Sequence, residues 1–295
     1  MRTEQARPVR LENYRPPDWL VETVELDVLL HPTDTKVRAT LKMSPNPRAG
    51  APAPIVLDGD GLTLTSLKLD GSVVHPDGYV ATPDSLTIAQ PPAGTCYLQI
   101  ETLVNPSANS QLMGLYRSSG TYCTQCEAEG FRRITYYPDR PDVMAVFTVR
   151  IEADKAEAPV LLANGNPKES GDLPGGRHFA VWHDPWPKPA YLFALVGGKL
   201  GHIEDTFVTM SGRKVALRIY VEPGKEARAD YAMDSLKRSM RWDEKTFGRE
   251  YDLDIFMVVA VSDFNMGAME NKGLNIFNDK YILAFPRRPT HDCLL

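Results

Sequence analysis

The sequence has few cysteines, no long apolar run and no excess of basic charge, and each absence excludes a class of protein. Four cysteines among 295 residues are too few and too scattered for a disulfide framework, so a reducing cytoplasm is the expected location. No run of about 18 apolar residues is present, which predicts no membrane span, and the charged N-terminus lacks the apolar segment of a secretory signal. A net charge of -5 predicts no general attraction to nucleic acid.

Metal-binding patterns are also absent. The zinc-helix motif H-E-x-x-H does not occur, and no two of the six histidines are spaced i, i+4. Cys123 and Cys126 are spaced C-x-x-C, but no second Cys or His pair completes a zinc site, and no βαβ pattern surrounds them as a redox dithiol requires. Structural thiols are the favoured interpretation. A dithiol oxidoreductase is a remote alternative.

The first two thirds of the chain show the period-2 pattern of β-strands. Apolar residues alternate with polar ones over 24–30 and again over 37–43, and the turn His31–Asp34 between them predicts a hairpin. Further strand candidates cover residues 55–57, 62–69, 85–89, 96–105, 145–153, 160–162, 178–183 and 191–196. Many short strands separated by Gly, Pro and Asp predict an antiparallel sandwich or saddle.

The pattern changes after Gly198. A strand over 215–221 precedes a helix from Ala227 to Phe247, whose apolar residues recur at a 3.6-residue period and which Gly248 would cap. Strands over 251–261 and 274–277 follow. We therefore expect an all-β domain over 1–198 and a mixed α+β domain over 199–295. Because this second sheet lacks further helices to cover it, we expect apolar strand surface to be exposed.

Two segments place carboxylates beside small residues. Glu127 and Glu129 lie in Cys123–Arg132, and Glu270 lies in Asn265–Asn271. Two carboxylates that converge on an α-ammonium group form charge-assisted hydrogen bonds, about twice as strong as neutral ones. Glycine and alanine lack bulk, so a peptide backbone can pair with the loop. The plain alternative is a pair of turns with solvated acids.

A dense charged stretch surrounds Tyr136-Tyr137-Pro138. It holds three basic and two acidic residues, namely Arg132, Arg133, Asp139, Arg140 and Asp142. We expect ion pairs that hold a loop, with a weaker chance of contact to substrate.

These stretches together resemble the zinc-dependent aminopeptidase N family, in its bacterial branch. The resemblance is carried by Cys123–Arg132, Ile134–Asp142 and Asn265–Asn275, with support from Tyr191–Val196. It extends from about Tyr14 to about Ala284.

The resemblance implies a mainly β fold, with an N-terminal antiparallel β-saddle domain followed by the opening α+β portion of a thermolysin-like catalytic domain. It also implies that peptides with a free N-terminus are the substrates. Glu127 and Glu270 would grip the free amine, Gly267 and Ala268 would align the peptide backbone, and Gln125 and Met266 would shape the first side-chain pocket. The substrate-binding set is completed by Met269 and Asn271.

The sequence departs from the family pattern where the zinc helix is expected. Complete members bind zinc through H-E-x-x-H and a downstream Glu, and neither the motif nor its general base is present here. The tail Phe285–Leu295 is unlike the family's continuation, as a frameshift or premature stop would produce, and His291 has no partner. We therefore expect a substrate-binding half-site without catalytic or metal-binding residues. The alternative is a non-catalytic module that binds peptide N-termini or a partner chain.

Overall fold

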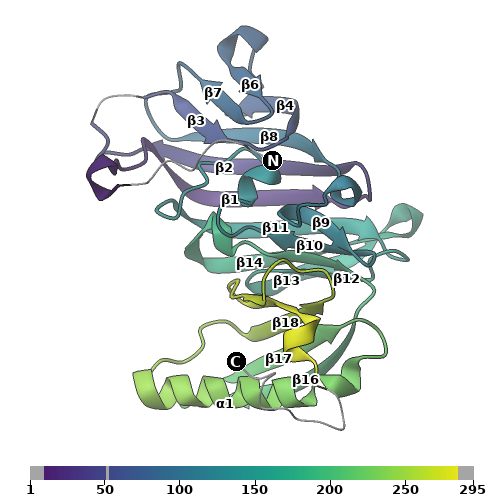
Figure 1. The fold of residues 1–295 in the computed structure, drawn as a ribbon. Helices are drawn as coiled ribbons and strands as arrows, with labels where there is room; N and C mark the ends of the chain where they lie inside the picture. Colours follow the sequence, from purple (N-terminus) through teal and green to yellow (C-terminus); the bar gives the residue numbers. More distant parts are fainter. Residues whose placement is uncertain (1–9, 51–52, 285–295) are drawn as a thin grey trace.

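The computed structural model describes residues 10–50 and 53–284, and these form four β-sheets and two α-helices (Figure 1). The mainly β fold expected from the sequence is confirmed. The tail 285–295, with His291, lies outside the described residues. No described helix is long and apolar enough to cross a membrane.

The largest sheet has eight strands and forms the base of the saddle. Its strands, in spatial order, are β13 (Asn166–Leu173), β14 (Arg177–Pro189), β11 (Met144–Asp154), β1 (Trp19–Leu29), β2 (Thr35–Pro45), β8 (Cys96–Val104), β4 (Thr63–Leu69) and β5 (Ser72–Val73). The predicted hairpin is confirmed, because β1 and β2 pair antiparallel from Trp19–Pro45 to Leu29–Lys36. Only β1 and β11 pair in parallel among these strands.

Two smaller sheets pack on this large sheet, and the three sheets together form the saddle. One contains β3 (Ile55–Asp58), β7 (Ser85–Ile88) and β6 (Val80–Thr82), and the other contains β12 (Val160–Ala163), β15 (Leu195–Gly198), β10 (Thr121–Gln125) and β9 (Gly114–Ser118). In these three sheets the sequence analysis missed β5, β6, β9, β10 and β13. It also placed a strand over 191–196, where a short 3-10 helix (Ala190–Leu192) precedes β15.

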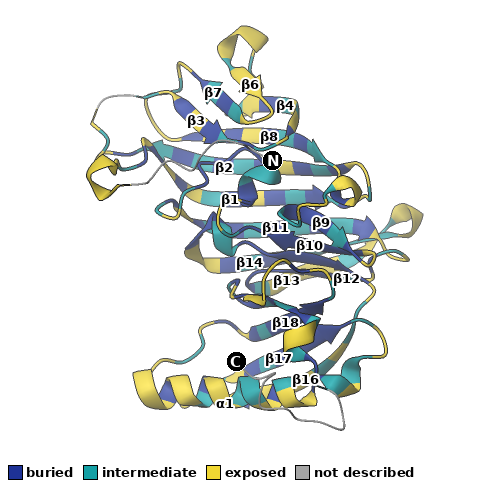
Figure 2. Ribbon diagram, in the orientation of Figure 1, coloured by how far each residue is buried: buried dark blue, intermediate teal, exposed yellow. Residues whose placement is uncertain are grey.

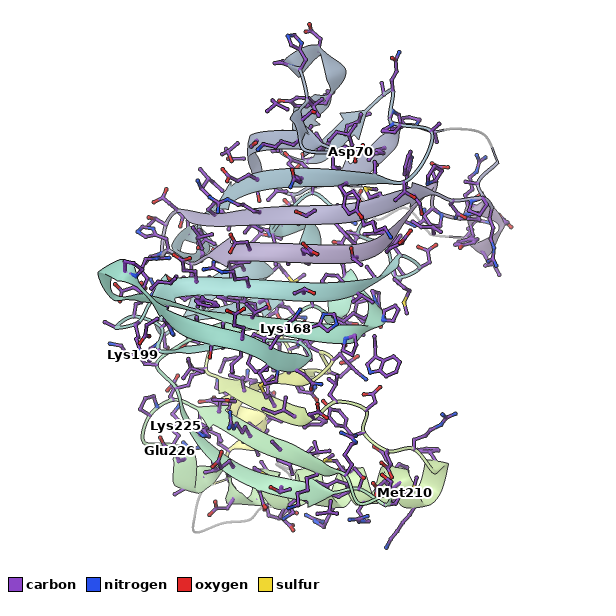
Figure 3. All side chains as sticks on the ribbon, turned by 180° about the vertical axis from the view of Figure 1, so that it is seen from behind. Asp70, Lys168, Lys199, Met210, Lys225 and Glu226 are labelled. Atoms are coloured by element: carbon purple, nitrogen blue, oxygen red, sulfur yellow. The ribbon has the colours of Figure 1, made fainter. Side chains whose placement is uncertain are left out.

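The second part of the chain forms a five-stranded sheet with a helix on one face. The strands are β16 (Gly201–Val208), β17 (Lys214–Val221), β18 (Ile255–Val261), β20 (Leu274–Asn278) and β19 (Ala268–Met269), and the helices are α1 (Asp230–Phe247) and α2 (Asp279–Ile282). Gly248 ends α1 in the left-handed conformation at φ 61°, as its predicted capping role requires. Seen from behind, Lys168 of β13 lies where the saddle meets this sheet, and Met210 lies at the distant end near α1 (Figure 3).

The inner strands of this second sheet, β17, β18 and β20, are covered on both faces. Strand β18 is buried over most of its length (Figure 2). Its Met257 and Val259 join the core shared with the saddle, whereas Val258 and Ala260 join the core beneath α1. The expectation that apolar strand surface stays exposed is therefore wrong for these inner strands, whereas Val208 of the edge strand β16 is 46% exposed. The saddle covers the face of this sheet that has no helix, and the sequence of residues 199–295 alone cannot show this.

Candidate functional site

Strand β10 leads into the first carboxylate-bearing segment. It lies between β9 and β15, and all five of its side chains are buried. Gln125 is its last residue, and the half-buried Glu127 follows two positions later. The amide of Gly130 donates to the carbonyl of Cys126 at 2.8 Å, and a Cβ atom at Gly130 would collide with the Gln125 carbonyl. A tight turn thus fixes the backbone from which the Glu127 carboxylate extends.

The second segment connects β18 to β20 and contains the two-residue edge strand β19. Ala268 and Met269 pair antiparallel with Phe277 and Ile276 of β20, and the carbonyl of Gly267 accepts from the amide of Asn278 at 3.0 Å. β19 is the outermost strand of its sheet, so its other edge has no strand partner among the described residues. Side chains alternate here, because Met269 is buried in the core while Ala268 and Glu270 are exposed.

The two segments come into contact through one pair of side chains. Gln125 donates through Nε2 to the sulfur of Met266 at 3.0 Å, although 141 positions separate them. The fold therefore brings together the loop that carries Glu127 and the loop that carries Glu270.

Two buried side-chain oxygens in these segments lack a hydrogen-bond partner among the described residues. They are Oε1 of Gln125 and Oδ1 of Asn271, and each residue is about 1% exposed. The other polar atom of the Asn271 side chain stays within its own loop, where Nδ2 donates to the carbonyl of Met269 at 3.5 Å. A buried acceptor without a donor costs about 1–3 kcal/mol, so unpaired acceptors mark a position where a donor such as an ammonium group or water would bind favourably.

The charged stretch that follows Glu127 is an ion-pair network, as expected. Oδ2 of the buried Asp139 accepts from the backbone amide of Arg132 at 3.1 Å and from its Nε at 3.2 Å. The same guanidinium lies 3.4 Å from Glu129 and 3.7 Å from Asp58. Burial raises the pKa of Asp139 to about 6, against partial opposition from Arg132. Glu129 thus pairs with a cation, whereas no ion pair is recorded for Glu127 among the described residues.

The Cys123–Cys126 pair is buried and reduced. Both thiols are free and fully buried, and burial raises the pKa of each well above its usual range. A reactive dithiol needs an accessible sulfur with a lowered pKa, so this environment favours the structural interpretation.

The described residues do not provide a zinc site. Over 10–50 and 53–284, no group of three His, Cys, Asp or Glu side chains is arranged to hold a metal ion. The donor set that zinc requires is four ligands in structural sites and three in catalytic ones.

Two saddle residues that the sequence analysis did not single out also contact the second segment. Ser118 bonds to Asp263 near the start of the segment, and Asn164 bonds to Lys272 near its end. Serine and asparagine are common in turns, so their positions in the sequence carry no signal for this role.

Comparison with known proteins places this fold in a family. Residues 23–192 match the peptidase M1 N-terminal domain, and residues 231–293 match the peptidase family M1 domain. The chain belongs to peptidase family M1. The second match reaches residue 293, which runs against the divergence from the family that the sequence analysis expected for 285–295.

Aminopeptidases resemble this M1 chain over nearly all of its length. Aminopeptidase N of Caulobacter vibrioides is 56% identical over 290 residues, which is 98% of this chain and 33% of the relative. Aminopeptidase N of Escherichia coli is 50% identical over 96% of this chain and 32% of the relative. The crystal structure of Legionella pneumophila aminopeptidase A in complex with aspartic acid superposes with a TM-score of 0.92 at 36% identity, over 97% of this chain and 34% of that one. The chain thus spans about a third of the length of these relatives.

Proposed function

We propose that this M1 chain supplies the part of an aminopeptidase active site that binds the free amino terminus of a peptide. Glu127 and Glu270 accept hydrogen bonds from the substrate ammonium group. The contact between Gln125 and Met266 is the observation that supports this assignment most strongly, because it brings the two carboxylate-bearing loops together. Neither carboxylate takes part in an ion pair among the described residues, whereas the neighbouring Glu129 does.

The backbone of the second segment would align the peptide. The free edge of β19 offers amides and carbonyls to an extended chain, as in β-strand addition. Gly267 leaves space for that chain, because a Cβ atom there would meet only a Tyr281 ring carbon at 3.9 Å. In this proposal Ala268 lies along the peptide, Met269 anchors the strand in the core, and Asn271 shapes the turn that follows.

An unpaired oxygen of Gln125 supports the same ligand class. Oε1 belongs to the side chain that contacts Met266, and no donor pairs with it among the described residues. The Legionella relative was solved in complex with aspartic acid, which carries a free α-amino group. A free amino acid or a peptide N-terminus is therefore the class of ligand that we assign to this half-site.

The whole protein to which this chain corresponds would remove N-terminal residues from peptides, with zinc supplying the Lewis acid and the activated water. We assign the binding role to the 295-residue chain alone and no hydrolysis, because the sequence lacks H-E-x-x-H. In this scheme residues 1–198 form the saddle domain and 199–295 the catalytic-domain portion. Free, buried thiols are in keeping with a cytoplasmic location.

Calorimetry with a free-amine peptide and the same peptide N-acetylated tests whether the chain binds a free amino terminus. We expect measurable heat for the free-amine peptide and much weaker binding of the acetylated one, because acetylation removes the charge that the carboxylates recognise. Equal affinities for the two peptides would exclude amine recognition.

An aminoacyl-anilide assay of the purified chain with added zinc tests the second half of the proposal. We expect the purified chain to release no more anilide than buffer alone. Release that follows the protein through purification would show that the chain itself hydrolyses substrates.

A further inference from the structure

The start of the second segment is bonded to the saddle through Asp263. The hydroxyl of the buried Ser118 donates to Oδ2 of Asp263 at 3.0 Å and accepts from its amide at 3.1 Å. The hydroxyl of Tyr116 donates to the Asp263 carbonyl at 3.1 Å. Three polar groups of one residue are thus held by two residues of β9.

The end of the segment is bonded to the saddle through Asn164. This residue follows β12 and is about 1% exposed. Its Nδ2 donates to the carbonyl of Lys272 at 2.8 Å and to that of Leu192 at 3.0 Å, while its Oδ1 accepts from the amide of Ala194 at 2.7 Å. One buried amide therefore joins β12, the approach to β15 and the residue two positions after Glu270.

Two glycines bring the backbones together beside this bond. Gly165, at φ +91°, has no room for a Cβ atom because it packs on the His183 carbonyl. Gly273, at φ +74°, faces it, and a Cβ atom there would lie 2.8 Å from a Leu253 methyl group and 3.2 Å from the Gly165 nitrogen. Both positions require glycine on backbone and steric grounds, so the approach of the two chains at Asn164 is built into the fold.

We propose that Ser118 and Asn164 are positioning residues that hold the loop 263–272 at both ends and so set Glu270 in place opposite the Glu127 segment. This inference rests on the proposed amine-binding function. The loop is bonded to the saddle at Asp263 and at Lys272, with the Gln125–Met266 contact between them. The saddle then preorganises the half-site within this chain, and the binding of a peptide does not need to order the loop.

Two variants and two matched controls test the proposal. Asn164→Ala removes the side-chain bond to Lys272, and Ser118→Ala removes the side-chain bonds to Asp263. Asn46→Ala removes another buried asparagine, 8% exposed against 1% for Asn164, whose side chain bonds only inside the saddle, to the Pro17 carbonyl at 2.7 Å and the Arg48 amide at 3.0 Å. Thr35→Val removes a buried hydroxyl that donates to His31 and accepts from its amide.

The first readout is affinity for the free-amine peptide, measured where all five proteins are folded. We expect about tenfold weaker binding for each positioning variant, which corresponds to about 1.4 kcal/mol, and unchanged binding for the controls even where their melting temperatures fall as far. Equal affinities across variants and controls would overturn the positioning role.

The second readout is hydrogen exchange in peptides that cover 263–278, which needs no ligand. Faster exchange there in Asn164→Ala and Ser118→Ala, but not in the controls, is the expected result. If the wild-type chain binds no free-amine peptide, the proposed function fails, and exchange still decides the positioning role. Unchanged exchange in both variants would overturn it.

Discussion

The side chain of Gln125 lies against the sulfur of Met266 at 3.0 Å, and this contact joins two loops that belong to different sheets. Gln125 ends the buried strand β10, and Met266 precedes the edge strand β19. Each loop carries a carboxylate within four residues of the contact, Glu127 on one side and Glu270 on the other. The arrangement sets the end of a saddle strand against the loop that precedes the edge strand of the second sheet.

Glu270→Gln and Glu127→Gln should each weaken binding of a free-amine peptide by at least tenfold. A hydrogen bond to a charged group contributes about 1.5–3 kcal/mol, and the amide retains the shape without the charge. Calorimetry measures the effect. Glu129→Gln is the matched control, since Glu129 pairs with Arg132 and should leave affinity unchanged. Equal losses in all three variants would point to a general charge effect.

Lys188→Met should lower the free energy of unfolding by about 3–5 kcal/mol. Lys188 and Asp184 form a buried ion pair at 3.1 Å, and the ammonium also lies 4.0 Å from the centre of the Phe147 ring. Burial lowers the pKa of Lys188 to about 8, which shows how strongly this position disfavours charge. Removal of the lysine leaves the Asp184 carboxylate buried and unpaired.

The double variant Lys188→Met, Asp184→Leu should recover at least half of that loss, because both charges are gone. Urea unfolding of the three proteins measures the comparison. A double variant less stable than Lys188→Met alone would contradict this account of the pair.

Asp139 should make stability fall as pH rises from about 4 to about 6. Burial raises its native pKa to about 6, above the unfolded value of about 3.9, so the native state binds the proton more readily in this window. Relative to Asp139→Asn, the wild-type chain should lose about 1.4 kcal/mol of stability per pH unit across it. Urea unfolding at several pH values measures the difference, and a difference that stays constant or grows with pH would contradict the assignment.

Cys123 and Cys126 should be inert towards thiol reagents in the folded chain. Both are buried with raised pKa values, and burial also raises the pKa of Cys96 to about 11. In a Cys293→Ser background, Ellman's reagent at about pH 8 should titrate none of these thiols before unfolding and all of them afterwards. Rapid reaction of two thiols in the native protein would revive the dithiol alternative.

The sequence predicted the elements whose side chains alternate cleanly. The β1–β2 hairpin and the helix capped at Gly248 have one buried face each, so their periods of 2 and 3.6 are visible. Strand β10 was missed because its five side chains are all buried and three of them are polar or weakly polar, which erases the alternation. The cover over β18 was missed because it comes from the saddle, which is distant in sequence.

The site could be predicted only as far as local chemistry reaches. The small residues beside the acids made Glu127 and Glu270 candidates. Only the family resemblance assigned both to one amine-binding site. The positioning role of Asn164 depends on its hydrogen bond to Lys272, which lies 108 positions later in the chain. No period or motif in the sequence indicates that these two residues pair. Tertiary contacts of single polar residues leave no pattern in one sequence.

A crystal structure of the 295-residue chain grown with a free-amine dipeptide tests the central claim most directly. The account predicts the ammonium nitrogen within about 3 Å of carboxylate oxygens of both Glu127 and Glu270, with the peptide backbone along β19. A dipeptide bound elsewhere, or the two carboxylates turned away from a shared nitrogen, would contradict it.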